Sequence, residues 1–103
     1  MSATSASLHH GKAELFRTLG HPVRIRVLEL LEERPMAVRE LLADIDVESS
    51  SLSQQLAVLR RAGLVTSTRR GGTVEYALAT PRVAELLEVG RALLQVLEPG
   101  TSS

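Results

Sequence analysis

Four arginines stand in a stretch of the chain that contains no acidic residue. Residues 49–74 hold no Asp or Glu, whereas residues 1–48 hold six basic and eight acidic side chains. The four are Arg60, Arg61, Arg69 and Arg70. The formal net charge of the chain is zero, so its positive excess lies in this one segment. A polyanion responds to the local field rather than to the net charge, so the segment is suited to contact with phosphates.

Hydroxyl and amide side chains precede these arginines on a segment that is expected to be helical. A helical wheel of residues 49–62 places Leu52, Leu56 and Leu59 together on one side. Gln can bond adenine through two hydrogen bonds in the major groove, hydroxyls can bond bases or phosphates, and arginine suits a phosphate. The residues opposite or beside the leucines are therefore candidate DNA contacts. They are Ser50, Ser51, Ser53, Gln54, Gln55 and Arg61.

Arg69 and Arg70 belong to a turn between two short segments rich in β-forming residues. Residues 64–68 and 73–78 flank the sequence Arg-Arg-Gly-Gly, which is typical of a β-hairpin. Such a turn alone is usually just solvated. Beside a recognition helix, we expect Arg69 and Arg70 to contact phosphates or to enter a minor groove. Residues 69–73 are called the wing below.

The surrounding pattern predicts the elements that position these groups. Helices are expected over 12–19, from Pro22 to the Arg34-Pro35 stop, over 38–45, over 49–62 with Ser49 as its N-cap, and from Pro81 to about 97. The fold class is mainly α with a small β-hairpin, in the order of a winged helix-turn-helix. The domain is expected to span 10–98, with disordered tails at 1–9 and 99–103.

The last helix carries an apolar face that is wide for so small a domain. Apolar residues recur every three or four positions from Val83 to Leu97, with Val89 and Val96 beside the stripe. Aromatic residues make up only 2% of the chain, so its own core is modest. An exposed face of this kind favours association. We therefore expect a homodimer joined through the last helix.

Composition excludes several classes of protein. The chain has no cysteine, which rules out disulfides and thiolate metal sites. Its N-terminus lacks the regions of a signal peptide and no apolar run could cross a membrane, so a cytoplasmic protein with no membrane partner is expected. No Ser-His-acid or paired-carboxylate arrangement is legible, so we expect neither an enzyme nor a cofactor.

Three segments resemble the ArsR/SmtB family of winged-helix repressors. They are residues 19–28, residues 50–65, which contain Leu-Arg-Arg-Ala-Gly-Leu-Val, and the wing segment ending at Tyr76-Ala-Leu78. The resemblance covers about residues 12–97. It implies a homodimer that uses its first and last helices as interface. It also implies operator binding that a ligand weakens.

Metal ligands known in that family have no counterpart here. The third-helix cysteine pair falls on Ala37 and Arg39. The last-helix ligands fall on Thr80, Arg82, Leu93 and Val96, none of which is a normal metal ligand. His9 and His10 are interpreted as a polar lead-in, and His21 as an N-cap or a solvent-facing group. No metal site is expected.

Two single residues, Arg24 and Tyr76, are expected to have structural roles, and the expected partners follow from the DNA-binding interpretation. Arg24 is expected in a structural ion pair, and Tyr76 is expected to pack the wing against the body. The partners are a double-stranded pseudo-palindromic operator and a second copy of the chain, and the sequence identifies no effector. Phosphorylation of the 49–53 serine run would place a dianion at the DNA-facing end of the helix. The alternative function is a winged-helix adaptor for protein interactions with a vestigial DNA face.

Overall fold

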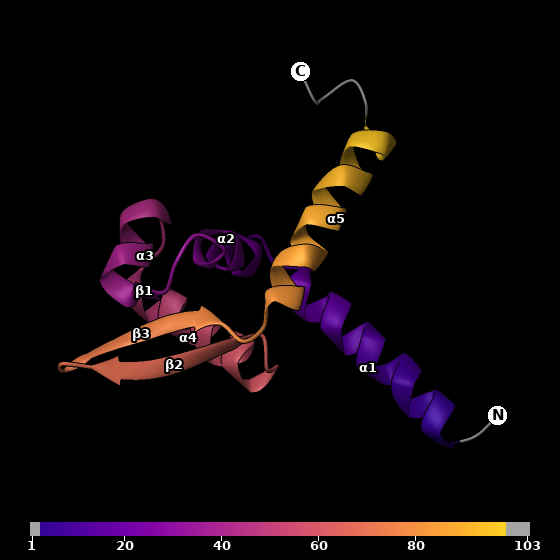
Figure 1. Cartoon of the computed structure of the whole chain (residues 1–103), viewed down its shortest axis with the longest axis horizontal. Helices are drawn as coiled ribbons and strands as arrows, with labels where there is room; N and C mark the ends of the chain where they lie inside the picture. The colour runs from indigo at the N-terminus through magenta and orange to yellow at the C-terminus, as the bar shows by residue number, and fades with distance from the viewer. Residues whose placement is uncertain (1–2, 99–103) are drawn as a thin grey trace.

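The computed structural model describes the backbone of residues 3–98 and the side chains of residues 10–98. Its elements follow the order α1, α2, β1, α3, α4, β2, β3, α5 (Figure 1). The helices are α1 (Ala3–Leu19), α2 (Pro22–Leu31), α3 (Val38–Asp44), α4 (Ser49–Arg61) and α5 (Pro81–Leu97). The strands are β1 (Met36–Ala37), β2 (Val65–Arg70) and β3 (Thr73–Leu78). The predicted mainly helical winged helix-turn-helix is confirmed.

The sheet contains a strand that the sequence did not predict. The three strands are antiparallel in the order β1-β3-β2, so the hairpin has a third member. Met36 pairs with Tyr76, and Ala37 pairs with Glu75. The expectation of a hairpin alone was therefore incomplete. A two-residue strand has no periodicity of its own, and its pairing is with residues far along the chain.

Helix α1 begins earlier than expected. Its backbone is helical from Ala3, whereas the sequence placed the start at Lys12. Residues 3–11 contain no proline, and alanine and serine are tolerated in a helix, so this segment can be helical. It has few apolar side chains and therefore no helical period that would have predicted the earlier start. The domain boundary at residue 10 thus falls inside α1. The disorder expected of 1–9 and 99–103 stays a prediction, and residues 1–2 and 99–103 lie outside the described part.

Two helix starts can be compared with their predicted caps. His21 caps α2 as expected, because its Nδ1 accepts a hydrogen bond from the backbone N of Val23 at 3.2 Å. Ser49 is not a cap. It is the first residue of α4, and Glu48 occupies the N-cap position without a capping hydrogen bond from its side chain.

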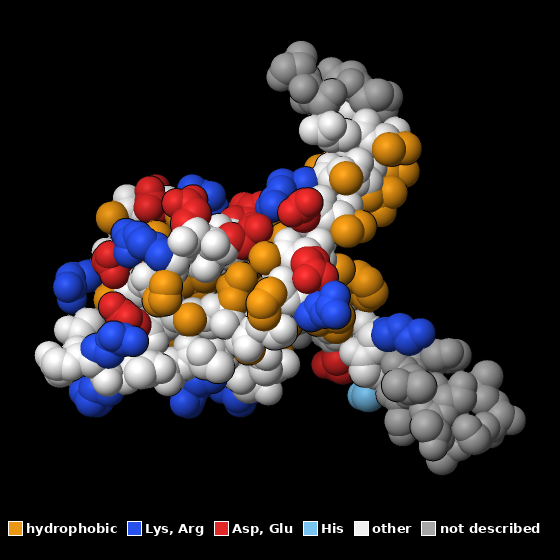
Figure 2. Space-filling model, in the orientation of Figure 1, with side chains coloured by type: hydrophobic (Ala, Val, Ile, Leu, Met, Phe, Trp, Pro, Cys, Tyr) orange, Lys and Arg blue, Asp and Glu red, His pale blue; other side chains and the backbone are white. Residues whose placement is uncertain are grey.

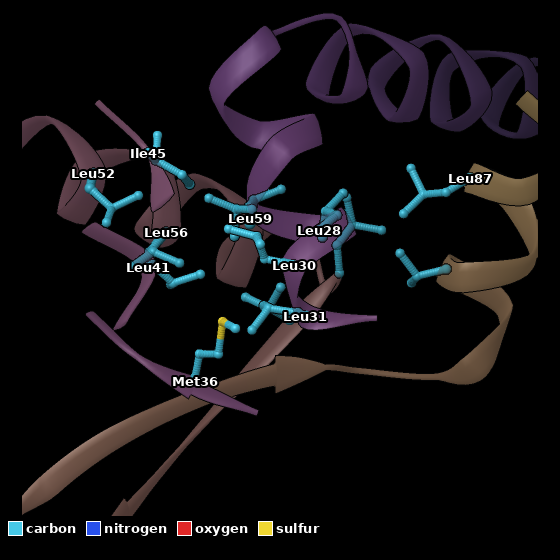
Figure 3. Close-up of a cluster of buried hydrophobic side chains, with 14 residues drawn as sticks. Leu28, Leu30, Leu31, Met36, Leu41, Ile45, Leu52, Leu56, Leu59 and Leu87 are labelled. Carbon is cyan, nitrogen blue, oxygen red and sulfur yellow. The ribbon is translucent and has the colours of Figure 1, made fainter. Parts of the chain in front are cut away.

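Leucines from several elements form one core around α2 (Figure 3). Leu28, Leu41, Leu52, Leu56 and Leu59 are fully buried. The start of α5 joins this core through Val83 and Leu87. Tyr76 packs against it from the sheet, as predicted. The core therefore fixes α4 and the base of the sheet relative to α2.

Helices α1 and α5 diverge from the point where they meet, on the side of the molecule away from the tip of the β2–β3 hairpin (Figure 1). No helix in the described part of the chain is long and apolar enough to span a membrane.

Candidate nucleic-acid interface

The rotation of α4 about its own axis is set by its buried leucines. Leu52, Leu56 and Leu59 each have no exposed area, as the helical wheel predicted. Leu41 of α3 is also fully buried, and α3 packs against α4 across the short turn between them. The opposite face of α4 consequently points to solvent.

The predicted contact residues of α4 divide into two groups. Ser50, Ser53, Gln54 and Arg61 are exposed, and Ser51 and Gln55 are partly buried. Arg60 is also exposed, although the sequence interpretation left it out of the contact set. Its position beside Arg61 was the signal that could have included it.

Gln55 is bound to another helix. The Nε of Arg24 donates a hydrogen bond to Oε1 of Gln55 at 2.7 Å, and Nη1 of Arg24 donates to the carbonyl of Thr18 at 3.2 Å. Within residues 10–98, no acidic group forms an ion pair with Arg24. The prediction of an ion pair for Arg24 was therefore wrong, because its partners are the Gln55 amide oxygen and the Thr18 carbonyl near the end of α1.

The wing closes with a tight two-residue turn. Gly71 and Gly72 have φ angles of 54° and 84°, which a type I′ turn requires and which glycine adopts without steric cost. Arg70 pairs with Thr73 directly before the turn, so Arg69 and Arg70 lie at the hairpin tip, and both are exposed. The β-strand period of two places their side chains on opposite faces.

Positive charge collects on the edge of the molecule formed by α4 and the hairpin. Lys and Arg side chains project from the lower edge of the space-filling view, where Figure 1 places these elements (Figure 2). No carboxylate occurs between Glu48 at the N-cap of α4 and Glu75 in β3. The exposed surface of α4 and the wing therefore presents hydroxyls, one free amide and arginines, and the nearest carboxylate along the hairpin is Glu75, 3.6 Å from Arg70.

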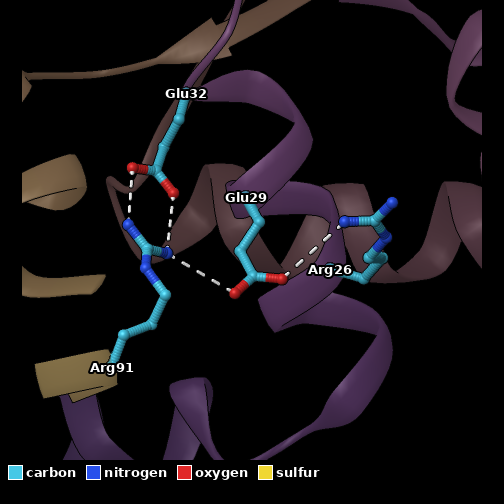
Figure 4. Close-up of polar contacts among 4 residues, drawn as sticks. All are labelled: Arg26, Glu29, Glu32 and Arg91. Carbon is cyan, nitrogen blue, oxygen red and sulfur yellow. Dashed lines mark hydrogen bonds and ion pairs between the residues drawn. The ribbon is translucent and has the colours of Figure 1, made fainter. Parts of the chain in front are cut away.

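A charged network holds α5 against α2 (Figure 4). Arg91 donates to both carboxylate oxygens of Glu32, at 3.2 and 3.3 Å, and lies 3.6 Å from Glu29. These hydrogen bonds to Glu32 raise the pKa of Arg91 above its ordinary value. Glu29 is also paired with Arg26, at 3.9 Å. The network links the second half of α5 to the end of α2, in addition to the buried contacts at the start of α5.

The residues that stand at the metal-ligand positions of the ArsR/SmtB family do not suit a metal ion here. Thr80 caps α5 by accepting from the backbone N of Arg82 at 3.3 Å, and Arg82 is paired with Glu85 at 2.8 Å. Leu93 and Val96 are exposed apolar residues. Among the residues whose placement is described, no group of three or more His, Cys, Asp or Glu side chains could hold a metal ion.

Comparison with known proteins agrees with this geometry. A family model described as bacterial regulatory protein, arsR family, matches residues 21–67. The uncharacterized HTH-type transcriptional regulator Rv0081 of Mycobacterium tuberculosis is 56% identical over 91 residues, covering 87% of this chain and 80% of that protein. The biofilm growth-associated repressor of Agrobacterium fabrum is 41% identical over 76 residues, covering 74% of this chain and 65% of that protein.

Solved structures give the same result. The crystal structure of Rv0081 superposes with a TM-score of 0.86 at 52% identity, covering 93% of this chain and 97% of that one. The homodimeric winged helix-turn-helix domain Mb0332 of Mycobacterium bovis superposes with a TM-score of 0.87 at 25% identity, covering 100% of this chain and 96% of that one. The chain belongs to the ArsR family of bacterial regulatory proteins, and it is a DNA-binding transcriptional regulator of the helix-turn-helix type.

Proposed function

We propose that this protein is a repressor that binds a specific operator, with α4 in the major groove and the wing on phosphates or in a minor groove. One observation carries the proposal. The face of α4 opposite Leu52, Leu56 and Leu59 is exposed, and it offers serine hydroxyls and the Gln54 amide at its start and arginines at its end. Base contacts of a recognition helix come from its N-terminal residues, and cations farther along suit the phosphates.

The repressor role is supported by a relative and by the chemistry of the surface. The Agrobacterium fabrum relative is named a repressor. A winged helix bound within a promoter would occupy DNA that a polymerase needs, which would block transcription without any catalytic group.

We propose that the protein acts as a homodimer. Val96 of α5 is 75% exposed, and Phe16 of α1 is 61% exposed. Most other apolar residues in the second half of α5 are exposed as well. Hydrophobic side chains line the outer side of α5 (Figure 2). A contiguous apolar surface on a small protein favours burial against a partner. The homodimeric Mycobacterium bovis neighbour of the same fold supports a second copy as that partner.

A two-fold dimer reads a pseudo-palindromic site. Its two recognition helices enter successive major grooves, so the half-sites lie about 34–36 Å apart. The wing of each subunit then reaches the DNA flanking its own half-site.

We propose that the regulation, if a ligand provides it, does not use metal at the sites common in the family. Ala37, Arg39, Thr80, Arg82, Leu93 and Val96 stand at those positions. An organic ligand, a partner protein, phosphorylation within the serine run at 49–53, or the protein level remain as routes.

The test is a gel-shift titration on the promoter of the protein's own gene against a scrambled duplex of equal length and composition. We expect a discrete shifted band on the promoter at concentrations that leave the scrambled duplex free. Equal, weak binding to both duplexes would contradict the proposal. It would favour the alternative of a winged-helix adaptor with a vestigial DNA face.

A further inference from the structure

Arg24 of α2 connects three helices through two hydrogen bonds. Its Nε donates to Gln55 of the recognition helix at 2.7 Å, and its Nη1 donates to the carbonyl of Thr18 near the end of α1 at 3.2 Å. Arg24 and Gln55 are both partly buried, which shields the pair from competing water. The contact therefore fixes a side chain on the edge of the proposed DNA surface.

The chemistry of the pair determines how the Gln55 amide is oriented. A guanidinium has only donors, so the amide atom that faces Arg24 must be the oxygen. The NH₂ group of Gln55 must then point away from Arg24, and no residue among 10–98 accepts a hydrogen bond from it. Hydrogen bonds from a charged donor are shorter and stronger than neutral ones, so this orientation is held firmly.

The charge of Arg24 makes this contact hard to replace. No acidic side chain among the described residues is within ion-pair distance of Arg24. Its guanidinium therefore donates to the amide oxygen of Gln55 and to the carbonyl of Thr18. Loss of the Gln55 oxygen would leave a partly buried cation without its shortest hydrogen bond. The two side chains are thus energetically coupled.

We propose that Arg24 is a positioning residue for operator recognition, which holds Gln55 so that it presents only hydrogen-bond donors to the DNA. This inference rests on the proposed function. Gln55 then suits a base-edge acceptor, such as guanine O6 or N7 or thymine O4. A bidentate bond to adenine needs the amide oxygen as well, so this contact falls to Gln54, whose side chain is exposed. The same two hydrogen bonds of Arg24 tie α4 to α1.

The experiment is a double-mutant cycle on an operator duplex that the unmodified protein selects from a randomised library. Arg24→Met keeps the apolar stem of the side chain but removes its donors, and Gln55→Ala removes the acceptor. We expect each change alone to weaken operator binding about tenfold, and the two together to weaken it little more than either alone. Arg24→Lys, which keeps a charged donor, should restore part of the loss.

Two further measurements separate positioning from a general structural role. The dependence of affinity on salt should not change in Arg24→Met, because Arg24 neutralises no phosphate. Reselection from the library with Arg24→Met should change the preferred base pair at one position of each half-site, because the Gln55 amide is then free to turn. Thermal unfolding of each variant establishes that the binding measurements report folded protein, and Arg24→Leu, which also lacks donors, takes the place of Arg24→Met in the cycle if the latter does not fold.

Arg26→Ala is the matched control, because Arg26 lies on the same helix but pairs with Glu29. Its effect should add independently to that of Gln55→Ala. Additive effects of Arg24→Met and Gln55→Ala, with an unchanged selected sequence, would overturn the inference while leaving the proposed function intact. A flatter salt dependence in Arg24→Met would also overturn it, by showing direct phosphate contact. Failure of the unmodified protein to enrich any sequence would instead refute the proposed function, and this inference with it.

Discussion

Arg70 and Glu75 form an ion pair across the β2–β3 hairpin, with 3.6 Å between Nε and Oε1. Arg69 forms no ion pair with any residue in the described part of the chain. The register places Arg69 opposite Val74 and Arg70 opposite Thr73, so the two arginines lie on opposite faces of the strand. Sequence reasoning treated them alike, but their electrostatic surroundings differ.

The wing arginines should therefore differ in their effect on DNA binding. Arg69→Ala is expected to weaken binding to operator and random duplexes alike, and by more than Arg70→Ala, because Glu75 already offsets part of the Arg70 charge. Glu75→Gln should strengthen binding to both duplexes. Salt series of binding isotherms check this, and removal of an arginine that contacts a phosphate should flatten the slope by about one unit per subunit. Unchanged affinity and slope in all three variants would show that the wing does not touch DNA.

Gln54 should read bases rather than hold the backbone. Gln54→Ala is expected to cost about 1–3 kcal/mol on the operator and to relax the preference at one or two base pairs. Binding to a scrambled duplex should stay nearly constant, since an amide neutralises no phosphate. Isotherms on both duplexes measure the difference. If the two affinities fall equally, the proposed orientation of α4 on DNA is wrong.

The exposed half of α5 should be the dimer interface. Leu93 and Val96 are 54% and 75% exposed, so Leu93→Asp and Val96→Asp leave the core of one subunit intact but place charges in the proposed interface. We expect a folded monomer with strongly reduced operator affinity. Sedimentation equilibrium measures the oligomeric state, and circular dichroism measures whether the variant is folded. Ala79→Asp, which adds the same charge at an exposed site before α5, is the control. A monodisperse monomer of the unmodified protein at micromolar concentration would contradict the dimer.

Operator binding should be insensitive to zinc. The residues at the family's metal positions offer no sulfur, imidazole or carboxylate ligand, so a stoichiometric amount of zinc should leave the isotherm unchanged. Protein treated with a chelator is the reference. A tenfold loss of affinity that disappears when His9 and His10 are changed would show that these histidines bind metal. His9 lies outside the side chains that the structure describes, and His10 is exposed.

Glu40 should make the stability depend on pH. Its carboxylate accepts a hydrogen bond from the backbone N of Ala37 at 2.9 Å and another from Arg34 at 2.8 Å, and these lower its pKa. A carboxyl whose pKa is lower in the folded state stabilises the fold above its unfolded-state pKa. This stabilisation is lost as the pH falls through the folded-state pKa. Urea unfolding from roughly pH 7 to pH 3 should show a smaller loss of stability in Glu40→Gln than in the parent protein. Parallel curves for the two proteins would show that the Glu40 carboxylate contributes no pH dependence to the stability.

The parts that the sequence predicted well are those with local signals. Leu52, Leu56 and Leu59 recur at helical spacing, so the buried and exposed faces of α4 followed directly from the period. Gly71 and Gly72 between two short segments rich in β-forming residues placed the wing turn correctly. Each of these patterns is complete within a few residues, which is why one sequence was sufficient.

The parts that were missed depend on residues far apart in the chain. Strand β1 exists because Met36 and Ala37 meet Tyr76 and Glu75. The Arg24–Gln55 contact depends on how α2 packs against α4, and helical periodicity contains no information on that packing. The cap at Ser49 was misplaced by one residue, which is the ordinary uncertainty of a helix end.

The Arg91 network also has a mechanical consequence. Arg91 of α5 is paired with Glu29 and Glu32 at the end of α2. In a dimer joined through α5, this contact lies between the dimer interface and the rest of each subunit, including α4 and the wing. A rotation of α5 about this contact would turn the two recognition helices relative to each other, while the half-sites of the DNA keep the spacing of its helical repeat. Loosening this contact would therefore change how well both subunits fit the operator at the same time.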